Sequence, residues 1–162
     1  MKSLSIRGVY IDRLSRTPVV TLREEDAPRR QFEIFIGVLE AEAIRTALAD
    51  EQAPRPLTHD LFVETLEKVS VAIVQVVLTH VTDGTYFADL VLMGEDQKEI
   101  VVSARPSDAL ALALRAHCPI YGSAELLDMV GEVPAPDEAT QQSEIIDEFR
   151  DFIENISPED FE

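Results

Sequence analysis

Two short segments carry arginine, hydroxyl and carboxylate side chains in the same order at the expected starts of two helices. The first is Arg55-Pro56-Leu57-Thr58-His59-Asp60, and the second is Arg105-Pro106-Ser107-Asp108. A helix start presents unpaired backbone N–H groups and the positive end of the helix dipole, so it favours anions. An arginine just before such a start is therefore suited to binding a phosphate or an oxyanion.

Helix capping is a structural explanation for part of the same pattern. Thr58 and Ser107 are suited to capping, because a hydroxyl accepts hydrogen bonds from the N–H groups of the first turn. Asp60 and Asp108 would then lie in that turn, where the dipole favours negative charge. We therefore expect capping to be the main role of both hydroxyls, and it can also account for both aspartates.

Capping does not explain the presence of three residues in these segments. His59 is expected in a first helical turn, where the dipole disfavours a protonated imidazole. A neutral histidine there could act as a general base or a metal ligand, and the alternative is an exposed residue without a chemical role. Arg55 and Arg105 could bind an anion, or each could form a salt bridge to a nearby acid such as Asp60 or Asp108.

The remaining candidate residues are weaker signals. Glu40 and Glu42 lie two positions apart on an expected helix, so they point to different faces and cannot easily ligate one ion. Asp89 lies on an apolar strand, either on a solvent face or in a functional role. Cys118 precedes Pro119 in an apolar setting and is expected to pack. No HExxH, EF-hand, P-loop, GxGxxG or GxSxG pattern is present in the sequence.

Hydrophobic periodicity predicts the elements that must position these residues. Strands are expected at 4–11, 18–22, 31–36, 71–81, 85–93 and 99–102, with a short extended piece at 119–121. Helices are expected at 38–49, 58–69, 107–116 and 123–130. The run 71–81 is apolar enough for a central strand buried on both faces, and Asp83-Gly84 is a hairpin turn signal. Grouped strands favour an α+β fold, with a mixed or antiparallel sheet built from two strand groups and packed with three to four helices.

Charge and composition divide the chain into three parts. We expect one domain at residues 1–131, a linker at 132–143 and an acidic amphipathic helix at 144–162. Residues 132–162 hold eleven acidic side chains and one basic one, and the whole chain has a net charge of −17. Such a balance argues against a nucleic-acid surface, which needs clustered lysine and arginine. The tail also carries an apolar stripe, which should dock on its own domain or on a protein partner.

The sequence lacks the usual features of secreted and membrane-inserted proteins, and this bears on the cellular compartment. The single cysteine cannot form an internal disulfide, and no apolar run approaches the roughly 20 residues that span a bilayer. The first residues have no continuous apolar stretch of the kind found in secretory signals. We therefore expect a cytoplasmic protein that is not inserted in a membrane.

Four co-linear segments resemble the bifunctional nuclease domain family, long catalogued as a domain of unknown function. They are Ile36-Gly37-Val38-Leu39-Glu40-Ala41-Glu42-Ala43-Ile44, Arg55 to Leu61, Asp83-Gly84-Thr85-Tyr86-Phe87-Ala88, and Ala104 to Arg115. The resemblance covers about residues 2–131. It implies a compact α+β domain, often self-associating with a dimer favoured, and the nuclease activity on DNA and RNA that is ascribed to plant members.

The resemblance also implies a candidate site. The matching positions are Glu40, His59, Asp60, Arg105 and Asp108. Glu40, Asp60 and Asp108 could hold a divalent ion such as Mg²⁺ or Mn²⁺, His59 could be the base, and Arg105, with Arg55, could bind the phosphate. Ser103 departs from the aspartate that often precedes the Ala-Arg-Pro-Ser-Asp run of the family. If that aspartate is a metal ligand elsewhere, this chain lacks it.

Two other functions compete with a nuclease. One is a non-catalytic, self-associating regulatory module that docks partners through residues 144–162, a tail that resembles the ends of actinobacterial members. The other is a sensor of small anions or metabolites at the Arg105 helix start.

Overall fold

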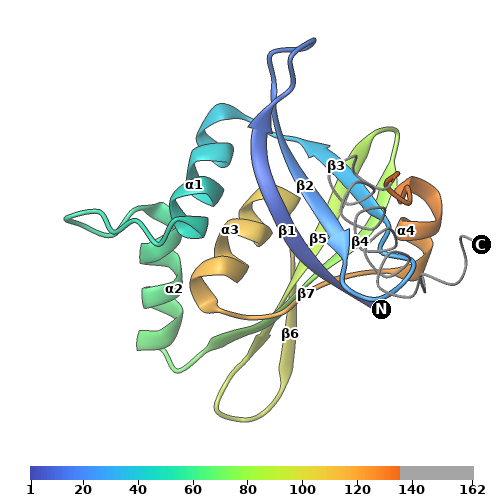
Figure 1. Ribbon diagram of the computed structural model, residues 1–162. Helices are drawn as coiled ribbons and strands as arrows, with labels where there is room; N and C mark the ends of the chain where they lie inside the picture. The colour runs from blue at the N-terminus through green and yellow to red at the C-terminus, as the bar shows by residue number, and fades with distance from the viewer. Residues whose placement is uncertain (136–162) are drawn as a thin grey trace, which may run out of the picture.

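The computed structural model describes residues 1–135, which form a seven-stranded mixed sheet packed with four helices (Figure 1). The strands are β1 (Lys2–Ile11), β2 (Pro18–Glu24), β3 (Gln31–Phe35), β4 (Ala72–Thr82), β5 (Thr85–Met93), β6 (Glu99–Ala104) and β7 (Ile120–Gly122). The helices are α1 (Val38–Leu48), α2 (Thr58–Lys68), α3 (Pro106–Ala116) and α4 (Ala124–Val130). The α+β class and the two strand groups expected from the sequence are confirmed.

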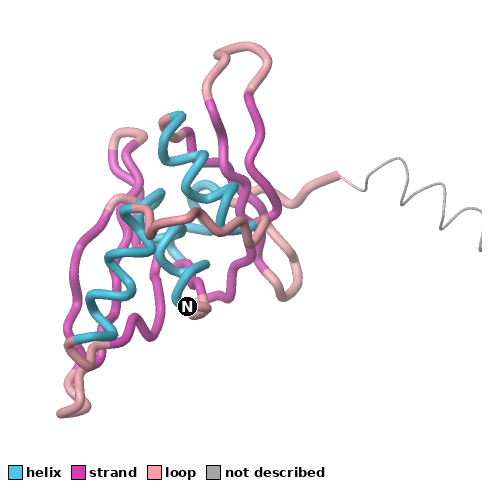
Figure 2. The backbone as a smooth tube through the Cα atoms, turned by 90° about the vertical axis from the view of Figure 1, so that its left-hand side faces the viewer, coloured by secondary structure: helices cyan, strands magenta, loops and turns pink. Residues whose placement is uncertain are grey.

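The strand order in the sheet is β3-β2-β1-β7-β4-β5-β6. The short strand β7 joins the two groups, because it pairs antiparallel with β1 and parallel with β4. Thr82 and Thr85 pair across the two-residue turn Asp83-Gly84, whose φ angles of 48° and 75° are those of the expected hairpin turn. The β1–β2 hairpin projects beyond the rest of the domain in both views (Figures 1 and 2).

One hydrophobic core combines alternate strand residues with side chains of α1, α3 and α4. Strand β4 has the central place that its sequence predicted, and its Val76 and Leu78 are fully buried in this core. The expected burial of both faces is wrong, because Gln75 and Val77 on the other face are only half-buried. The face of β4 that carries Gln75 and Val77 therefore keeps partial access to solvent.

The two helix starts differ from the capping prediction. The N-cap residues are Leu57 for α2 and Arg105 for α3, so Thr58 and Ser107 lie inside the helices and do not cap them. Pro106 explains the shift in α3, since proline is favoured at the first helical position. In α2 the carboxylate of Asp60 reaches back and accepts a hydrogen bond of 2.8 Å from the backbone N–H of Leu57.

The described chain ends beside the β3 edge of the sheet. Gln31 and Glu132 exchange two backbone hydrogen bonds of 2.8 and 2.9 Å, which attach the first residue of the expected linker to the domain. The rest of that linker from residue 136, and the helix expected at 144–162, lie outside the described residues. Within residues 1–135, every helix is too short or too polar to cross a bilayer.

Candidate functional site

Arg105 joins the starts of α1 and α3. Its Nε and Nη2 donate to the two carboxylate oxygens of Asp108 at 2.6 and 3.1 Å, and its Nη1 donates to Glu40 Oε1 at 3.1 Å. Of the two alternatives that the sequence left open for Arg105, the salt bridge to Asp108 is therefore present. The Arg105 side chain is nevertheless 66% exposed, so one face of the guanidinium remains open to an anion from solution.

His59 brings the start of α2 to the same place. Its Nε2 lies 3.2 Å from Asp108 Oδ1, and its side chain is 19% exposed, so it is not a free surface histidine. A hydrogen bond to a carboxylate requires the proton on Nε2, which leaves Nδ1 of a neutral ring as the proton acceptor. Asp108 thus holds the ring in the tautomer that a general base needs. We call Glu40, His59, Arg105 and Asp108 the polar corner.

The contacts of Asp108 lower the pKa of its carboxyl group. Burial by itself raises the pKa of this carboxyl, but hydrogen bonds from Arg105 and His59 outweigh burial and hold the pKa below the ordinary value of 3.8. The carboxylate therefore stays ionised when His59 and Arg105 are beside it, and it is available to orient both groups.

The lowered pKa of Asp108 predicts a pH effect on stability. The unfolded chain takes up the proton first, so the stabilisation is complete above pH 3.8 and is lost as the pH falls through the lower folded-state pKa. We expect the free energy of unfolding to fall less steeply below about pH 4 in Asp108→Asn than in the parent. Urea titrations from pH 7 to pH 3 measure both slopes, and equal slopes would contradict the expectation.

Asp60 follows His59 in sequence but pairs with Arg115 of α3 and not with Arg105. Arg115 also donates to the backbone carbonyls of Ala43 and Ala111 at 2.9 and 3.0 Å, and only 11% of its side chain is exposed. Although burial raises the pKa of Asp60, the contacts with Arg115 and the Leu57 N–H bring it below its ordinary value. Arg115 therefore fixes the start of α2, together with the neighbouring His59, against α1 and α3. We call the contacts of Arg115 with Asp60, Ala43 and Ala111 the Arg115 clamp.

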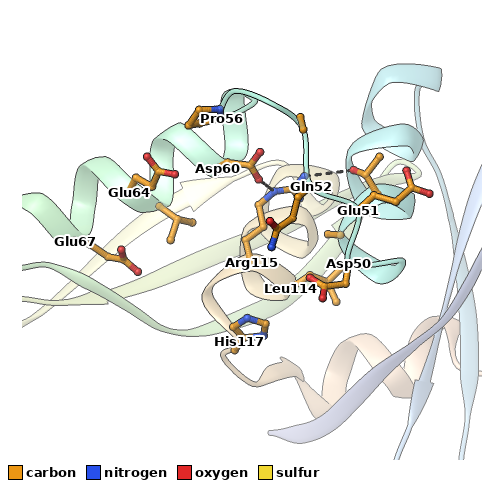
Figure 3. A pocket seen from close by; sticks show the side chains of 14 residues that line it. Asp50, Glu51, Gln52, Pro56, Asp60, Glu64, Glu67, Leu114, Arg115 and His117 are labelled. Carbon is orange, nitrogen blue, oxygen red and sulfur yellow. Dashed lines mark hydrogen bonds and ion pairs between the residues drawn. The ribbon is translucent and has the colours of Figure 1, made fainter.

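A pocket of about 450 Å³ opens beside this Arg115 clamp, between α1, α2 and the end of α3 (Figure 3). Asp60 and Arg115 meet on its wall, and Glu64 and Glu67 follow along α2. Asp50 and Glu51 line it from the end of α1 and the segment that follows. The excess of carboxylates makes this cavity unsuited to a phosphate, so the polar corner is the better candidate for that ligand.

The structure thus separates the candidate residues into two groups. It brings Glu40, His59, Arg105 and Asp108 together, and it places Asp60 with Arg115. Arg55 is exposed and, within residues 1–135, has no carboxylate partner, so the salt bridge to Asp60 considered from the sequence is not formed. Sequence reasoning missed Arg115 as a positioning residue, although it closes the Ala104–Arg115 segment and follows an apolar stretch.

The three carboxylates proposed as metal ligands do not converge. Asp60 faces the guanidinium of Arg115, while Glu40 and Asp108 both face that of Arg105. In the part of the chain that the structure describes, no three His, Cys, Asp or Glu side chains are arranged to hold a metal ion. The donors do not fit a three-carboxylate metal site, because guanidinium groups take the places that a cation would need.

The sequence profile of the bifunctional nuclease domain matches residues 20–134. The chain belongs to the bifunctional nuclease domain family. The match spans α1, α2 and α3, which carry the polar corner and the Arg115 clamp. The membership expected from the four sequence segments is therefore confirmed.

Individual relatives of two kinds support the same assignment. An uncharacterized protein of Mycobacterium tuberculosis is 33% identical over 99% of this chain and 98% of its own length. Bifunctional nuclease 1 of Oryza sativa subsp. japonica is 26% identical over 62% of this chain, and Bifunctional nuclease 1 of Arabidopsis thaliana is 25% identical over 70% of it. These matches cover 31% and 36% of the two plant proteins, so the chain corresponds to about a third of each.

Proposed function

We propose that the polar corner hydrolyses phosphodiester bonds of DNA or RNA. The observation that supports this most is the convergence of His59, Asp108 and Arg105 from two helix starts in a domain of the bifunctional nuclease family. The base and the exposed cation for phosphate, His59 and Arg105, both lie within hydrogen-bonding distance of Asp108, the group that orients the base. These are the groups that hydrolysis of a phosphodiester requires.

Each residue of the polar corner has a role in this proposal. A water molecule attacks phosphorus while Nδ1 of His59 takes its proton, and Asp108 holds the ring through Nε2. The new P–O bond forms as the bond to the leaving oxygen breaks, and that oxygen takes a proton from solvent. Arg105 binds the phosphate oxygens through its exposed face, and Glu40 keeps the guanidinium in place. Arg55, exposed just before α2, adds a second phosphate contact.

The acidic surface sets a limit on this function. The net charge of −17 repels a polyanion, and added salt screens this repulsion, so productive binding is expected with short substrates and at moderate rather than very low ionic strength. Dependence on Mg²⁺ or Mn²⁺ is a separate proposal that comes from the sequence. No step of the hydrolysis is assigned to a metal ion, because the three candidate carboxylates do not converge. The cytoplasmic location is likewise a proposal, which cell fractionation would test.

Digestion of nucleic acid by the purified full-length chain tests the proposal. Single-stranded and duplex DNA and RNA are incubated with the protein in the presence of Mg²⁺, Mn²⁺ or EDTA, at low and at moderate salt. We expect cleavage by the parent protein and none by the double variant His59→Ala, Asp108→Ala. Equal cleavage by both proteins would identify a contaminant and contradict the proposal, and the EDTA arm separately decides the metal dependence.

A second candidate function is a binding module without catalysis. It is favoured by α2, which has no buried residue and leaves Leu61, Phe62 and Val69 at 55%, 43% and 62% exposure. Such a surface is more typical of a docking site than of a monomer. Binding of a labelled oligonucleotide or protein partner without any cleavage would favour this function. Residues 144–162, the expected docking helix, lie outside the described residues.

A further inference from the structure

The β1–β2 hairpin is the most basic part of this acidic domain. Residues 2–23 hold five basic side chains and one acidic one, whereas residues 24–131 hold eight basic and 19 acidic ones. Arg7, Arg13 and Arg16 are exposed, and within the described part of the chain they form no ion pair. Arg13 and Arg16 lie in the hairpin loop, which projects from the domain and presents both cations to an anionic partner (Figures 1 and 2).

The one acidic side chain of this region is engaged inside the hairpin loop. The carboxylate of Asp12 accepts hydrogen bonds of 2.7 Å from the backbone N–H and from the hydroxyl of Ser15. The backbone N–H of Asp12 also donates to the carbonyl of Thr17 at 2.9 Å, which closes the loop. The loop therefore has a defined shape, and its aspartate orders the backbone without pairing with either arginine.

Apolar side chains continue from the hairpin loop onto the sheet. Tyr10 and Phe35 both pair with Val19 of the strand between them, so all three lie on one face. Val19 is buried, but Tyr10 and Phe35 are 43% and 59% exposed on either side of it. Ile11 and Leu14, at 55% and 95% exposure, extend the apolar surface to the tip of the hairpin. An apolar surface of this kind beside exposed arginines is typical of a docking site.

We propose that the acidic C-terminal segment of this chain, residues 144–162, docks on this surface. We call Tyr10, Leu14, Phe35, Arg13 and Arg16 the hairpin surface. The sequence predicts an amphipathic helix for the segment, and six apolar residues recur in it at helical spacing: Ile145, Ile146, Phe149, Phe152, Ile153 and Ile156. Most of the positions between them are acidic. The apolar stripe can therefore cover the apolar part of the hairpin surface while the carboxylates beside it meet the two arginines.

The length of the intervening chain permits this contact. Glu132 pairs with Gln31 at the start of β3, and Phe35, at the other end of that strand, is about 13 Å away at the rise of a strand. Because the pairing is antiparallel, the chain leaves in the direction opposite to β3 and must turn back toward the hairpin. Residues 136–144 can span up to about 30 Å when extended, which is enough for that return. A tethered segment also meets the surface at a high effective concentration.

Nucleic acid fits the hairpin surface less well than this segment does. Phosphates are attracted to Arg13 and Arg16, but a phosphate backbone would leave Leu14 and Phe35 exposed to water. An acidic amphipathic helix matches the charge and covers the apolar area together. The proposal does not depend on nuclease activity, since it rests on the exposure and the charge of the hairpin surface and on the sequence of the tail.

Helix α2 is a poorer site for the tail, although it also exposes apolar residues such as Leu61. Asp60, Glu64 and Glu67 lie on the same helix, and Lys68 is its one basic residue apart from the histidine. Like charges would oppose the approach of an acidic segment to this helix. The charge pattern therefore favours the hairpin surface over α2.

Hydrogen–deuterium exchange of the full-length chain tests the proposal. A helix of this kind owes most of its stability to packing, so slow exchange in residues 145–156 reports docking. Leu14→Asp is expected to speed exchange there about 10-fold or more, because it puts a like charge into the apolar contact. Leu61→Asp on α2 is the matched control and should leave the tail unchanged. Circular dichroism checks that both variants fold.

Charge reversal tests the electrostatic part of the contact. The double variant Arg13→Glu, Arg16→Glu is expected to release the tail as Leu14→Asp does, and added salt should release it in the parent. Lys68→Glu, Lys98→Glu makes the same change in net charge at exposed sites elsewhere and should not release it.

Four results would overturn the proposal. The first is exchange in the parent tail as fast as in an unfolded peptide. The second is a tail that stays protected in Leu14→Asp and in the double arginine variant. The third is equal release by the control variants, and release by Leu61→Asp alone would place the tail on α2. The fourth is weaker binding of an oligonucleotide to the double arginine variant with unchanged exchange of the tail, which would assign the hairpin surface to nucleic acid.

Discussion

Replacement of His59 by alanine is expected to lower the rate of phosphodiester hydrolysis by about 10²- to 10⁴-fold, the contribution of a general base. The side chain is 19% exposed at the start of α2, and Nε2 contacts Asp108. The loss should appear in kcat more than in KM, because Arg105 and Arg55 would still bind phosphate. Rates measured with a fluorescent oligonucleotide under single-turnover conditions report the effect.

His80 provides the matched control for this variant. It is an exposed histidine on β4 that stacks on Phe87, with ring centroids 4.4 Å apart, and it takes no part in the polar corner. His80→Ala should therefore retain the parent rate. Added imidazole should restore part of the activity of His59→Ala, since it can accept the proton in place of the missing ring. If His59→Ala cleaves as fast as the parent, His59 is not the base.

Replacement of Arg115 by alanine is expected to destabilise the domain by about 3 kcal/mol, as for loss of one partner of a buried ion pair. Arg115 is 11% exposed and connects Asp60 to the carbonyls of Ala43 and Ala111. Its removal leaves the half-buried carboxylate of Asp60 without its cationic partner and takes one donor from each of the two carbonyls. Because the chain has no tryptophan, urea unfolding is best followed by circular dichroism.

Arg45 is a suitable control for the Arg115 clamp. It also forms ion pairs, with Glu42 and Glu51, but its side chain is 48% exposed and water can replace those contacts. Arg45→Ala should therefore cost much less stability than Arg115→Ala. A double-mutant cycle with Asp60→Asn isolates the contribution of the Asp60–Arg115 pair. Equal losses in the two arginine variants would show that Arg115 does not clamp the three helices.

Local sequence patterns predicted most elements of the fold. The periodicity of α1, α3 and α4 and the Asp83-Gly84 turn depend on neighbouring residues, so they could be derived without tertiary contacts. The burial of α2 could not be derived in this way. Leu61, Phe62 and Val69 recur at helical spacing, yet they are exposed, because α2 packs on the core through Val63 and Leu66.

The helix starts show how far capping rules extend. Thr58 and Ser107 have the residue types of caps, but the backbone begins each helix one or two residues earlier. At α3 the first helical position belongs to Pro106, whose fixed φ angle suits that place. Residue type alone therefore identified the helix starts to within a turn, and the identity of each cap depended on competition among neighbouring residues.

The sequence by itself determined the family, the α+β class and the residue types that gather at the two helix starts. Only the tertiary structure decided which arginine meets which aspartate. Arg105 pairs with Asp108 on the same helix start, whereas Asp60 pairs with Arg115, 55 positions away, and Arg55 stays exposed. Spacing along a chain fixes what one helical turn presents, but it does not fix which helix packs beside that turn. The polar corner exists because α1 and α2 both pack against α3.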